Sequence, residues 1–509
     1  MTDARAHVCR ALLELTPERV LSDLLSASEK QSKEQVPADN LYRAIGFEND
    51  DSRLGWVNPP AWRDVEGVLR NFLNLRAGKG KTQFIFSGMG GSINAIKALN
   101  NTVKKESDIK IYTIDSLDPA AMARIFSSID DLSGILVVGI SKSGTTEETL
   151  TLLSTLREKL QAQGLDYHDH FLWLTDLPQG RAKIENAGWA GVEILPIQTN
   201  GRTDIGGRFS APHTTIFLIP LLLLLGKDMG RMKTLWSEYV QSRNRLFFEP
   251  TKKAHEFAEK DIRFFAIVLE KDLCALDTWA IQLFQESLGS KVNGFNPKTV
   301  VDLEELPDDF EPVDFQMASP EPVLRMMLRM HLLEVFVAVF AYYRGINFVT
   351  QPEVDVYKRK MKEVSAQDIP RTEKVTEREL VERIRSLLQS NVAKRFLEVI
   401  CYWQLEEDER SHFSCFLRAA FPEKEILVFA GSDWNHHSYQ AASKNDETFF
   451  LILIKESYEQ EIEGISDDTL QRNVRTLKTI AYATYSTLIH KSGFFKVLRT
   501  GTGQCENLG

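Results

Sequence analysis

The residues that decide the fold are GILVVGISKSGTTEETLTLLSTLREKL, positions 134–160 of the chain. The apolar start of this stretch, GILVVGI, has the length and composition of a buried strand. Its second half, EETLTLLSTLREKL, repeats apolar residues at helical spacing. The junction between the two halves is crowded with serine and threonine hydroxyl groups. The stretch therefore predicts a strand, a polar turn and a helix, which is one repeat of a parallel α/β sheet.

Strand-like and helix-like segments alternate on both sides of this stretch. Further apolar runs occur in TQFIFS, IKIYTID, HFLWLTD and VEILPI. A second series follows in RFFAIVLE, KTVVDL, KEILVFAGS and TFFLILIKE, with long helical stretches near residues 320–345 and 468–490. Strands that are nearly continuous in apolar residues are typical of parallel sheets covered on both faces. The predicted fold class is therefore α/β, with two three-layer α/β/α subdomains.

The length of 509 residues exceeds what one hydrophobic core usually supports, so more than one subdomain is expected. Residues 1–79 are predicted to form an N-terminal helical segment, in which Thr16-Pro17-Glu18 resembles a helix start. Residues 80–245 form the first predicted α/β subdomain. Residues 246–509 form the second, with helical insertions and a C-terminal helical segment.

The composition excludes several classes of protein. Apolar residues make up 43% of the chain and charged residues 26%, and the net charge is -10, which argues against nucleic acid or an anionic membrane as the main partner. The five cysteines are scattered without CxxC spacing, which favours a reducing cytoplasm over a disulfide framework and predicts no metal site. The longest apolar run, residues 216–225, contains Pro220 and is about half of a membrane span, so a buried helix is expected.

The hydroxyl-rich turn predicts an anion site. Helix N-termini present unpaired N–H groups and a positive dipole end, and in parallel sheets they lie where ligands bind. A glycine-rich turn, FSGMGGS at 86–92, joins another strand to another helix. Two such turns in consecutive units favour a crevice that binds a phosphorylated or sulfonated small molecule. The simpler alternative is a helix cap that is rich in serine and threonine.

Several segments in order carry a family resemblance. GMGGS and SKSGTTEET resemble the sugar-isomerase (SIS) domain, and the whole arrangement resembles the phosphoglucose isomerase family, which joins two SIS domains. Similar elements are TDIGGRFSA (203–211), WAIQLFQESLGSK (279–291), QPEVDVYK (351–358) and GSDWNHHSYQ (431–440). The histidine element follows the lysine element here, an order similar to that in the isomerase part of transaldolase–phosphoglucose isomerase fusions.

The resemblance implies a set of catalytic residues. Glu286 would be the base that moves a proton between C1 and C2, and Arg208 would stabilise the enediol charge. His436, with Lys358, would open the sugar ring. His437 is the alternative to His436. Simpler structural roles are also open: Gln282 and Glu286 could form a surface pair, Arg208 an ion pair, and Lys358 could lie on a solvated helix face. The implied substrate-binding residues are Gly91, Ser92, Ser141, Lys142, Ser143, Gly144, Thr145, Thr146, Gln282 and Gln351.

The expected activity is that of an aldose–ketose isomerase acting on glucose 6-phosphate and fructose 6-phosphate, without cofactor or metal. Departures from the family pattern, such as Ser290 in ESLGSK, leave other anionic sugars open as substrates, including mannose 6-phosphate and a C6-sulfonated sugar such as sulfoquinovose. A sensor that binds a sugar phosphate without turnover is the alternative from another class. The resemblance also implies a cytoplasmic homodimer, with the histidine loop acting within or across subunits.

Overall fold

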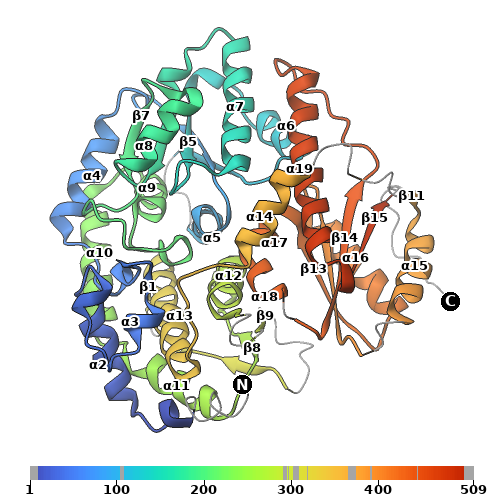
Figure 1. Cartoon of the computed structure of the whole chain (residues 1–509). Coiled ribbons are helices and arrows are strands. Elements are labelled where there is room, and N and C mark those ends of the chain that lie inside the picture. Colours follow the sequence, from blue (N-terminus) through green and yellow to red (C-terminus); the bar gives the residue numbers. More distant parts are fainter. Residues whose placement is uncertain are drawn as a thin grey trace. The chain divides into compact units, whose positions relative to one another are not determined.

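The computed structural model describes residues 10–103, 108–290, 295, 297–301, 309–317, 319–364, 369, 374–389, 393–443 and 445–497. The chain forms two compact units, which are described separately below (Figure 1). Neither unit is continuous in sequence. The first unit comprises Met1–Thr113, Ser133–Thr149 and Leu165–Gln351, and the second comprises Ile114–Leu132, Leu150–Gly164 and Pro352–Gly509.

A five-stranded sheet, in the order β4-β3-β5-β6-β7, organises the first unit. The pairs β3–β5, β5–β6 and β6–β7 are parallel, and β3, β5 and β6 are buried along their whole length. Because Ser87 pairs with Gly139, the turns that follow β3 and β5 start at the same edge of the sheet. The strands are β3 (Gln83–Ser87), β4 (Lys110–Ile114), β5 (Ile135–Ile140), β6 (Phe171–Thr175) and β7 (Glu193–Pro196).

The long helices of the first unit bury most of their apolar faces. Thr16 accepts a hydrogen bond from the N–H of Arg19 at the start of α2, which confirms the predicted cap. Every residue of α9 is buried, which confirms a core helix despite the internal Pro220. In the part of the chain that the structure describes, every helix is either too short or too polar to serve as a membrane span. The helices are α2 (Pro17–Ser28), α3 (Tyr42–Ile45), α4 (Trp62–Asn74), α5 (Asn94–Thr102), α8 (Gln179–Ile184), α9 (Thr215–Leu224), α10 (Met229–Arg243), α11 (Phe248–Glu259), α12 (Asp277–Leu288) and α13 (Pro322–Arg344).

Two smaller sheets complete this unit. The strands β8 (Phe264–Ile267), β9 (Lys298–Val300) and β10 (Glu311–Val313) form a parallel sheet in the order β10-β8-β9. The first two of these were predicted strands. A short antiparallel pair, β1 (Phe47–Glu48) and β2 (Asp51–Ser52), lies within the segment predicted to be helical.

A buried polar cluster joins α10 and α13 in the core of the first unit. His213 Nε2 lies 3.4 Å from Glu334 Oε2, and the Tyr239 hydroxyl lies 3.4 Å from the same nitrogen. Arg243 contacts His331 Nδ1 at 3.3 Å. Burial lowers the pKa of both histidines well below the usual value and raises the pKa of Glu334 well above it. The two histidines are therefore neutral in the folded protein at neutral pH.

The second unit is built on another five-stranded parallel sheet, in the order β11-β15-β14-β12-β13. Its strands are β11 (Lys374–Val375), β12 (Phe396–Cys401), β13 (Glu425–Ala430), β14 (Thr448–Lys455) and β15 (Ser492–Val497). Its helices are α6 (Pro119–Ser127), α14 (Val354–Glu363), α15 (Glu377–Gln389), α16 (Glu407–Ala420), α17 (Gly431–His437), α18 (Tyr439–Ala442) and α19 (Asp467–Thr487), and α7 (Glu147–Ala162) continues into it from the first unit. The predicted class of parallel sheets flanked by helices is confirmed.

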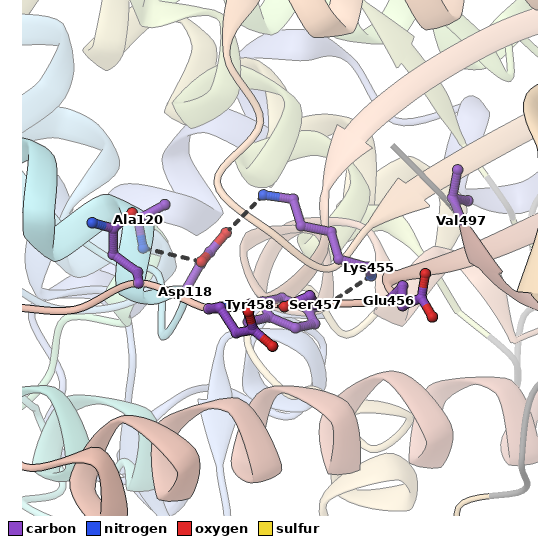
Figure 2. A pocket seen from close by; sticks show the side chains of 9 residues that line it. Asp118, Ala120, Lys455, Glu456, Ser457, Tyr458 and Val497 are labelled. Carbon is purple, nitrogen blue, oxygen red and sulfur yellow. Dashed lines mark hydrogen bonds and ion pairs between the residues drawn. The ribbon is translucent and has the colours of Figure 1, made fainter. Parts of the chain in front are cut away.

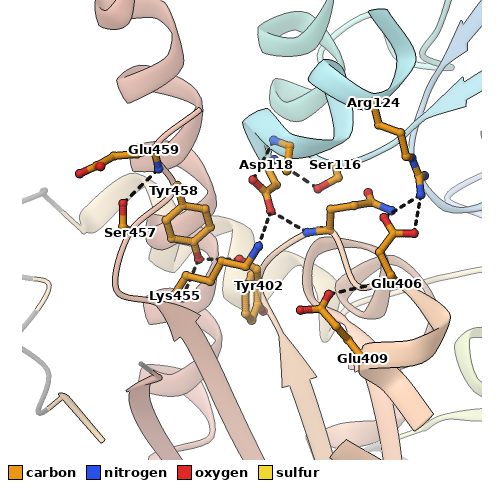
Figure 3. Close-up of polar contacts among 12 residues, drawn as sticks. Ser116, Asp118, Arg124, Tyr402, Glu406, Glu409, Lys455, Ser457, Tyr458 and Glu459 are labelled. Atoms are coloured by element: carbon orange, nitrogen blue, oxygen red, sulfur yellow. Dashed lines mark hydrogen bonds and ion pairs between the residues drawn. The ribbon is translucent and has the colours of Figure 1, made fainter. Parts of the chain in front are cut away.

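Asp118 anchors the N-terminus of α6 within the second unit (Figure 3). Its carboxylate accepts hydrogen bonds from the backbone N–H groups of Ala120 at 3.1 Å and Gln404 at 2.8 Å, and from Lys455 Nζ at 3.3 Å. Asp118 and Lys455 line a cavity of about 330 Å³ at the carboxyl ends of β14 and β15 (Figure 2). The cavity is lined by Asp118, Ala120, Lys455, Glu456, Ser457, Tyr458, Glu459, Gln460 and Val497.

The two large sheets fall within residues 80–245 and 246–509, the segments predicted for the two subdomains. The compact units follow other boundaries, because residues 246–351 belong to the first unit, whereas residues 114–132 and 150–164 belong to the second. The compact units are defined by contacts between residues, whereas the predicted subdomains are defined by the alternation of strands and helices along the sequence. The predicted subdomain boundaries therefore stay a prediction.

Candidate functional site

The glycine-rich turn after β3 supports the loop that carries Arg208. Gly91 lies so close to this loop that a Cβ atom would come 2.4 Å from the carbonyl oxygen of Gly207 and 2.8 Å from the nitrogen of Arg208. Ser210 Oγ also donates a hydrogen bond to the carbonyl of Gly91, at 3.3 Å. Ser92 closes the turn immediately before α5. Only glycine at position 91 lets the two backbones pass at this distance.

The turn after β5 is held together by its own hydroxyl groups. The hydroxyls of Ser141 and Thr146 lie 3.0 Å apart, and those of Ser143 and Thr145 lie 2.8 Å apart. Gly144 has a φ of 69°, and a Cβ atom there would come 2.7 Å from a backbone oxygen, so this position also requires glycine. Ser143 and Thr145 are exposed, whereas Ser141 is buried. The turn therefore presents two accessible hydroxyls directly before α7.

Lys142 and the first turn of α7 limit how strongly this turn can attract an anion. Lys142 Nζ donates a hydrogen bond to the carbonyl of Ile205 at 2.6 Å and lies 3.7 Å from Asp176. Burial lowers the pKa of Lys142. Glu147 and Glu148 begin the helix, and carboxylates at a helix N-terminus oppose a bound anion. Hydroxyl and amide donors, more than positive charge, are what the turn offers to a ligand.

Arg208 and Glu286 form a buried ion pair. Arg208 Nη1 lies 3.4 Å from Glu286 Oε1, and the two side chains are 1% and 7% exposed. Two further contacts fix the guanidinium: Nε donates to Ser287 Oγ at 2.6 Å, and Nη2 donates to the carbonyl of Phe348. Burial lowers the pKa of Arg208, and the nearby Glu286 opposes this shift. Because a guanidinium carries five N–H groups, donors remain for a further acceptor.

The helix α12 brings a second polar group to the same carboxylate. Gln282 lies one turn before Glu286, and its Nε2 donates a hydrogen bond to Glu286 Oε2 at 2.8 Å. Both residues are buried, so the alternative of a surface pair is wrong. Gln282 Oε1 accepts a hydrogen bond from Asn94 Nδ2 at 3.2 Å. Lys291, at the end of the same sequence element, lies outside the described residues.

Sequence reasoning missed Asn94 and Ser287. Ser287 directly follows Glu286, so the ES dipeptide was a signal for it. Asn94 follows the glycine turn by two residues, where an asparagine would ordinarily be assigned to a helix cap. Its contact with Gln282 joins residues 188 positions apart, and no local pattern reports such a contact.

The two adjacent histidines lie in the second unit and differ in burial. His437 is 3% exposed, lies 2.6 Å from Ser438 Oγ through its Nδ1, and packs edge-on against Phe429. His436 is only partly buried. His436 is therefore the more accessible of the two residues on α17, which favours it for a role that requires contact with a ligand.

The lysine and histidine elements are bonded to each other within the second unit. The N–H of Glu353 donates to Gln440 Oε1 at 3.1 Å, and the rings of Tyr357 and Tyr439 lie 4.7 Å apart. Lys358 is exposed on the next position of α14. The structure thus gives Gln440 a positioning role toward the start of the lysine element.

Some of the predicted residues contact one another within the first unit, and others belong to the second unit. In the first unit, Gln282, Glu286 and Arg208 form one contact network, and Gly91 packs against the Arg208 loop. Ser92 and residues 141–146 follow neighbouring strands of one sheet. Gln351 is the half-buried last residue of the first unit, whereas Lys358 and His436 belong to the second.

Comparison with known proteins bears on this arrangement. Residues 69–229 match the family model described as Phosphoglucose isomerase. Over these residues, the predicted resemblance to the phosphoglucose isomerase family is confirmed. A glucose-6-phosphate isomerase from Thermus thermophilus is 31% identical over 247 residues, which cover 47% of this chain and 56% of that protein. The glucose-6-phosphate isomerase of Chlamydia felis is 35% identical over 145 residues, 28% of this chain and 25% of that protein.

The match to phosphoglucose isomerases is partial, because the chain spans little more than half the length of the Thermus relative. A crystal structure of a hypothetical protein from Thermus thermophilus aligns with a TM-score of 0.51 and 21% identity, covering 68% of this chain and 94% of that chain. This likeness shows a shared fold. The narrower resemblance to the isomerase part of transaldolase fusions stays a prediction.

Proposed function

We propose that this protein is an aldose–ketose isomerase that interconverts glucose 6-phosphate and fructose 6-phosphate through an enediol. The observation that supports the proposal is the buried network of Arg208, Gln282 and Glu286 in the first unit. The relatives named glucose-6-phosphate isomerase point to the same reaction class. A protein that only binds a sugar phosphate has no need for a buried carboxylate beside a guanidinium.

Glu286 is the proposed base. Isomerisation removes a proton from C2 of the aldose and returns it to C1, and one carboxylate that reaches both carbons can do both steps. Gln282 holds one carboxylate oxygen, Oε2, at 2.8 Å, which fixes the plane of the carboxyl group. The exclusion of water around this buried group strengthens its interactions with a bound substrate.

Arg208 is the proposed electrophilic group. Enediol formation develops negative charge on oxygen, and a fixed cation lowers the free energy of that charged state more than that of the neutral sugar. Ser287 and the carbonyl of Phe348 hold the guanidinium in place before substrate arrives. A preorganised cation requires no rearrangement during the reaction, which is the source of its catalytic value.

Ring opening and substrate binding have their own proposed residues. His436 exchanges the proton between the ring oxygen and O1, and Lys358 assists it. The phosphate binds to the hydroxyl and amide groups of residues 141–146, with Gly91 and Ser92 on the neighbouring turn. Gln351 contacts the sugar hydroxyls. Each of these roles follows from the family resemblance and is open to substitution tests.

The first experiment measures conversion of fructose 6-phosphate to glucose 6-phosphate by the purified chain, with EDTA present, for the wild type and the Glu286→Gln variant. Loss of the base is expected to lower kcat by a factor of about 10³ or more, which corresponds to about 4 kcal/mol. The matched control is Glu259→Gln, a surface glutamate at the end of α11, which is expected to retain activity.

The outcomes separate the alternatives. Turnover in the wild type and its loss in a Glu286→Gln variant that still unfolds cooperatively, at a temperature well above that of the assay, support the isomerase. No turnover, together with protection of the wild type against thermal unfolding by the sugar phosphate, would indicate a binding protein. Activity on mannose 6-phosphate or on sulfoquinovose instead would move the proposal to that sugar. Light scattering tests the proposed homodimer, and cell fractionation tests the proposed cytoplasmic location.

A further inference from the structure

The first residue of α5, Asn94, occupies a place in the structure that its usual helix-terminal role does not explain. Asparagine near a helix start commonly accepts a hydrogen bond from a backbone N–H of the first turn. The start of α5 has no such side-chain bond, and Asn94 Oδ1 is buried without a hydrogen-bond partner. The side chain is 1% exposed and uses its amide N–H to contact Gln282. A capping role is therefore excluded.

We infer that Asn94 is a positioning residue that sets the orientation of the Gln282 amide and, through it, the carboxylate of Glu286. The inference rests on the proposed function of Glu286. In the structure Asn94 turns its Nδ2 donor toward Gln282, which favours the orientation in which the Gln282 oxygen faces Asn94. The amide nitrogen of Gln282 then faces the other way, where it donates to Glu286 Oε2 at 2.8 Å.

Burial makes this orientation consequential. Asn94 is 1% exposed and Gln282 is 3% exposed, so solvent does not replace a lost partner at either site. If the Gln282 amide rotated by half a turn, its oxygen would face the Glu286 carboxylate, and two acceptors would meet in a dry environment. Asn94 thus adds to the preference for the amide orientation that the Glu286 carboxylate also requires.

The test replaces the donor without changing the shape of the side chain. Asn94→Asp keeps the size of the residue but leaves a carboxylate that accepts hydrogen bonds, so the Gln282 amide is expected to rotate toward it. We expect kcat to fall on the order of 10²-fold, because the catalytic carboxylate loses its fixed position, while KM changes by less than about threefold. Asn94→Leu, which removes both polar atoms, is expected to lower kcat less than Asn94→Asp.

Asn100 provides a matched control on the same helix. Its Nδ2 donates to the carbonyl of Ile111 at 3.2 Å, away from α12, and its Oδ1 is buried without a partner, as in Asn94. Asn100→Asp therefore makes the same chemical change on the same helix, at a half-buried residue. We expect this variant to retain the kcat of the wild type even if its unfolding temperature falls.

A second measurement tests the contact without using activity. In a cycle of Asn94→Ala, Gln282→Ala and the double variant, the loss of unfolding temperature in the double variant is expected to be smaller than the sum of the two single losses. Additive losses would overturn the contact. A rise in KM with unchanged kcat in Asn94→Asp would overturn the positioning role and indicate a substrate contact. An inactive wild type would overturn the proposed function, and the cycle would still decide whether Asn94 holds Gln282.

Discussion

Replacing Gly91 by alanine tests whether the glycine turn sets the position of Arg208. A Cβ atom at position 91 would lie 2.4 Å from the carbonyl oxygen of Gly207, whereas ordinary contacts begin at 3.4 Å. The two turns must therefore separate by about 1.0 Å, the difference between these two distances. The peptide group that moves is the one that joins Gly207 to Arg208. Because the Arg208 side chain is held by Ser287 at its other end, the shift strains the guanidinium contact with α12.

The expected effects are a loss of stability and a larger loss of turnover. Forcing a methyl group into a packed backbone contact costs about 1–3 kcal/mol. A misplacement of about 1 Å at a catalytic group lowers the rate on the order of 10²-fold. The denaturant midpoint and the kcat/KM for fructose 6-phosphate of Gly91→Ala measure the two effects separately.

Gly207→Ala is the control for this prediction. No heavy atom lies within 4 Å of a Cβ atom built at position 207, so alanine fits there without displacement. Its stability is expected to stay within about 0.5 kcal/mol of the wild type. The reasoning would be refuted by a Gly91→Ala protein with the stability and turnover of the wild type, or by equal damage in both variants.

Two further predictions concern stability alone. Because burial lowers the pKa of His213 and His331, both histidines take up a proton on unfolding when the pH is below 6.5. The free energy of unfolding is therefore unaffected by them above pH 6.5 and falls below that pH by up to about 1.4 kcal/mol per pH unit for each histidine. Urea unfolding at pH 7.5 and 5.5 should show a smaller pH effect in His331→Gln than in the wild type, and an equal effect would contradict this account. Asp118→Ala leaves Lys455 without its carboxylate and removes a helix cap, and is expected to cost about 3 kcal/mol in chemical unfolding. Arg124→Ala, which breaks an exposed ion pair on the same helix, should cost less than about 1 kcal/mol, and similar losses in the two variants would show that the burial of Asp118 is irrelevant.

The sequence predicted the sheets where the apolar runs are continuous. The strands β3, β5 and β6 are buried along their whole length, so packing on both faces demanded apolar residues at every position. The strand β12 was missed because Glu398 interrupts its apolar run. In the structure Glu398 is buried and accepts a hydrogen bond from Trp434 Nε1 at 2.9 Å. The partner that makes this carboxylate tolerable comes from α17, and a local pattern cannot report it.

In the candidate site, too, the sequence predicted local relationships and missed contacts between distant residues. Gln282 and Glu286 are separated by one helical turn, so their shared face was readable from spacing. The restriction at Gly91 was not, because the atoms that require glycine belong to a loop more than 100 positions away. A Cβ atom at Gly207 would have open space around it. The close backbone contact between Gly207 and Gly91 therefore requires glycine at position 91 and not at position 207.

The proposed reaction and the choice of sugar depend on different parts of the first unit. The helix α12 carries Gln282, Glu286 and Ser287, and each of these side chains is satisfied by a partner within the protein. Such a closed network can transfer a proton at any sugar that presents C1 and C2 to it, so it does not distinguish one anionic group from another. The exposed hydroxyls of Ser143 and Thr145 have no comparable enclosure. In the proposed isomerase, the turn after β5 therefore determines the preference for a phosphate or a sulfonate. Substitutions in this turn are expected to change KM, whereas substitutions in α12 are expected to change kcat.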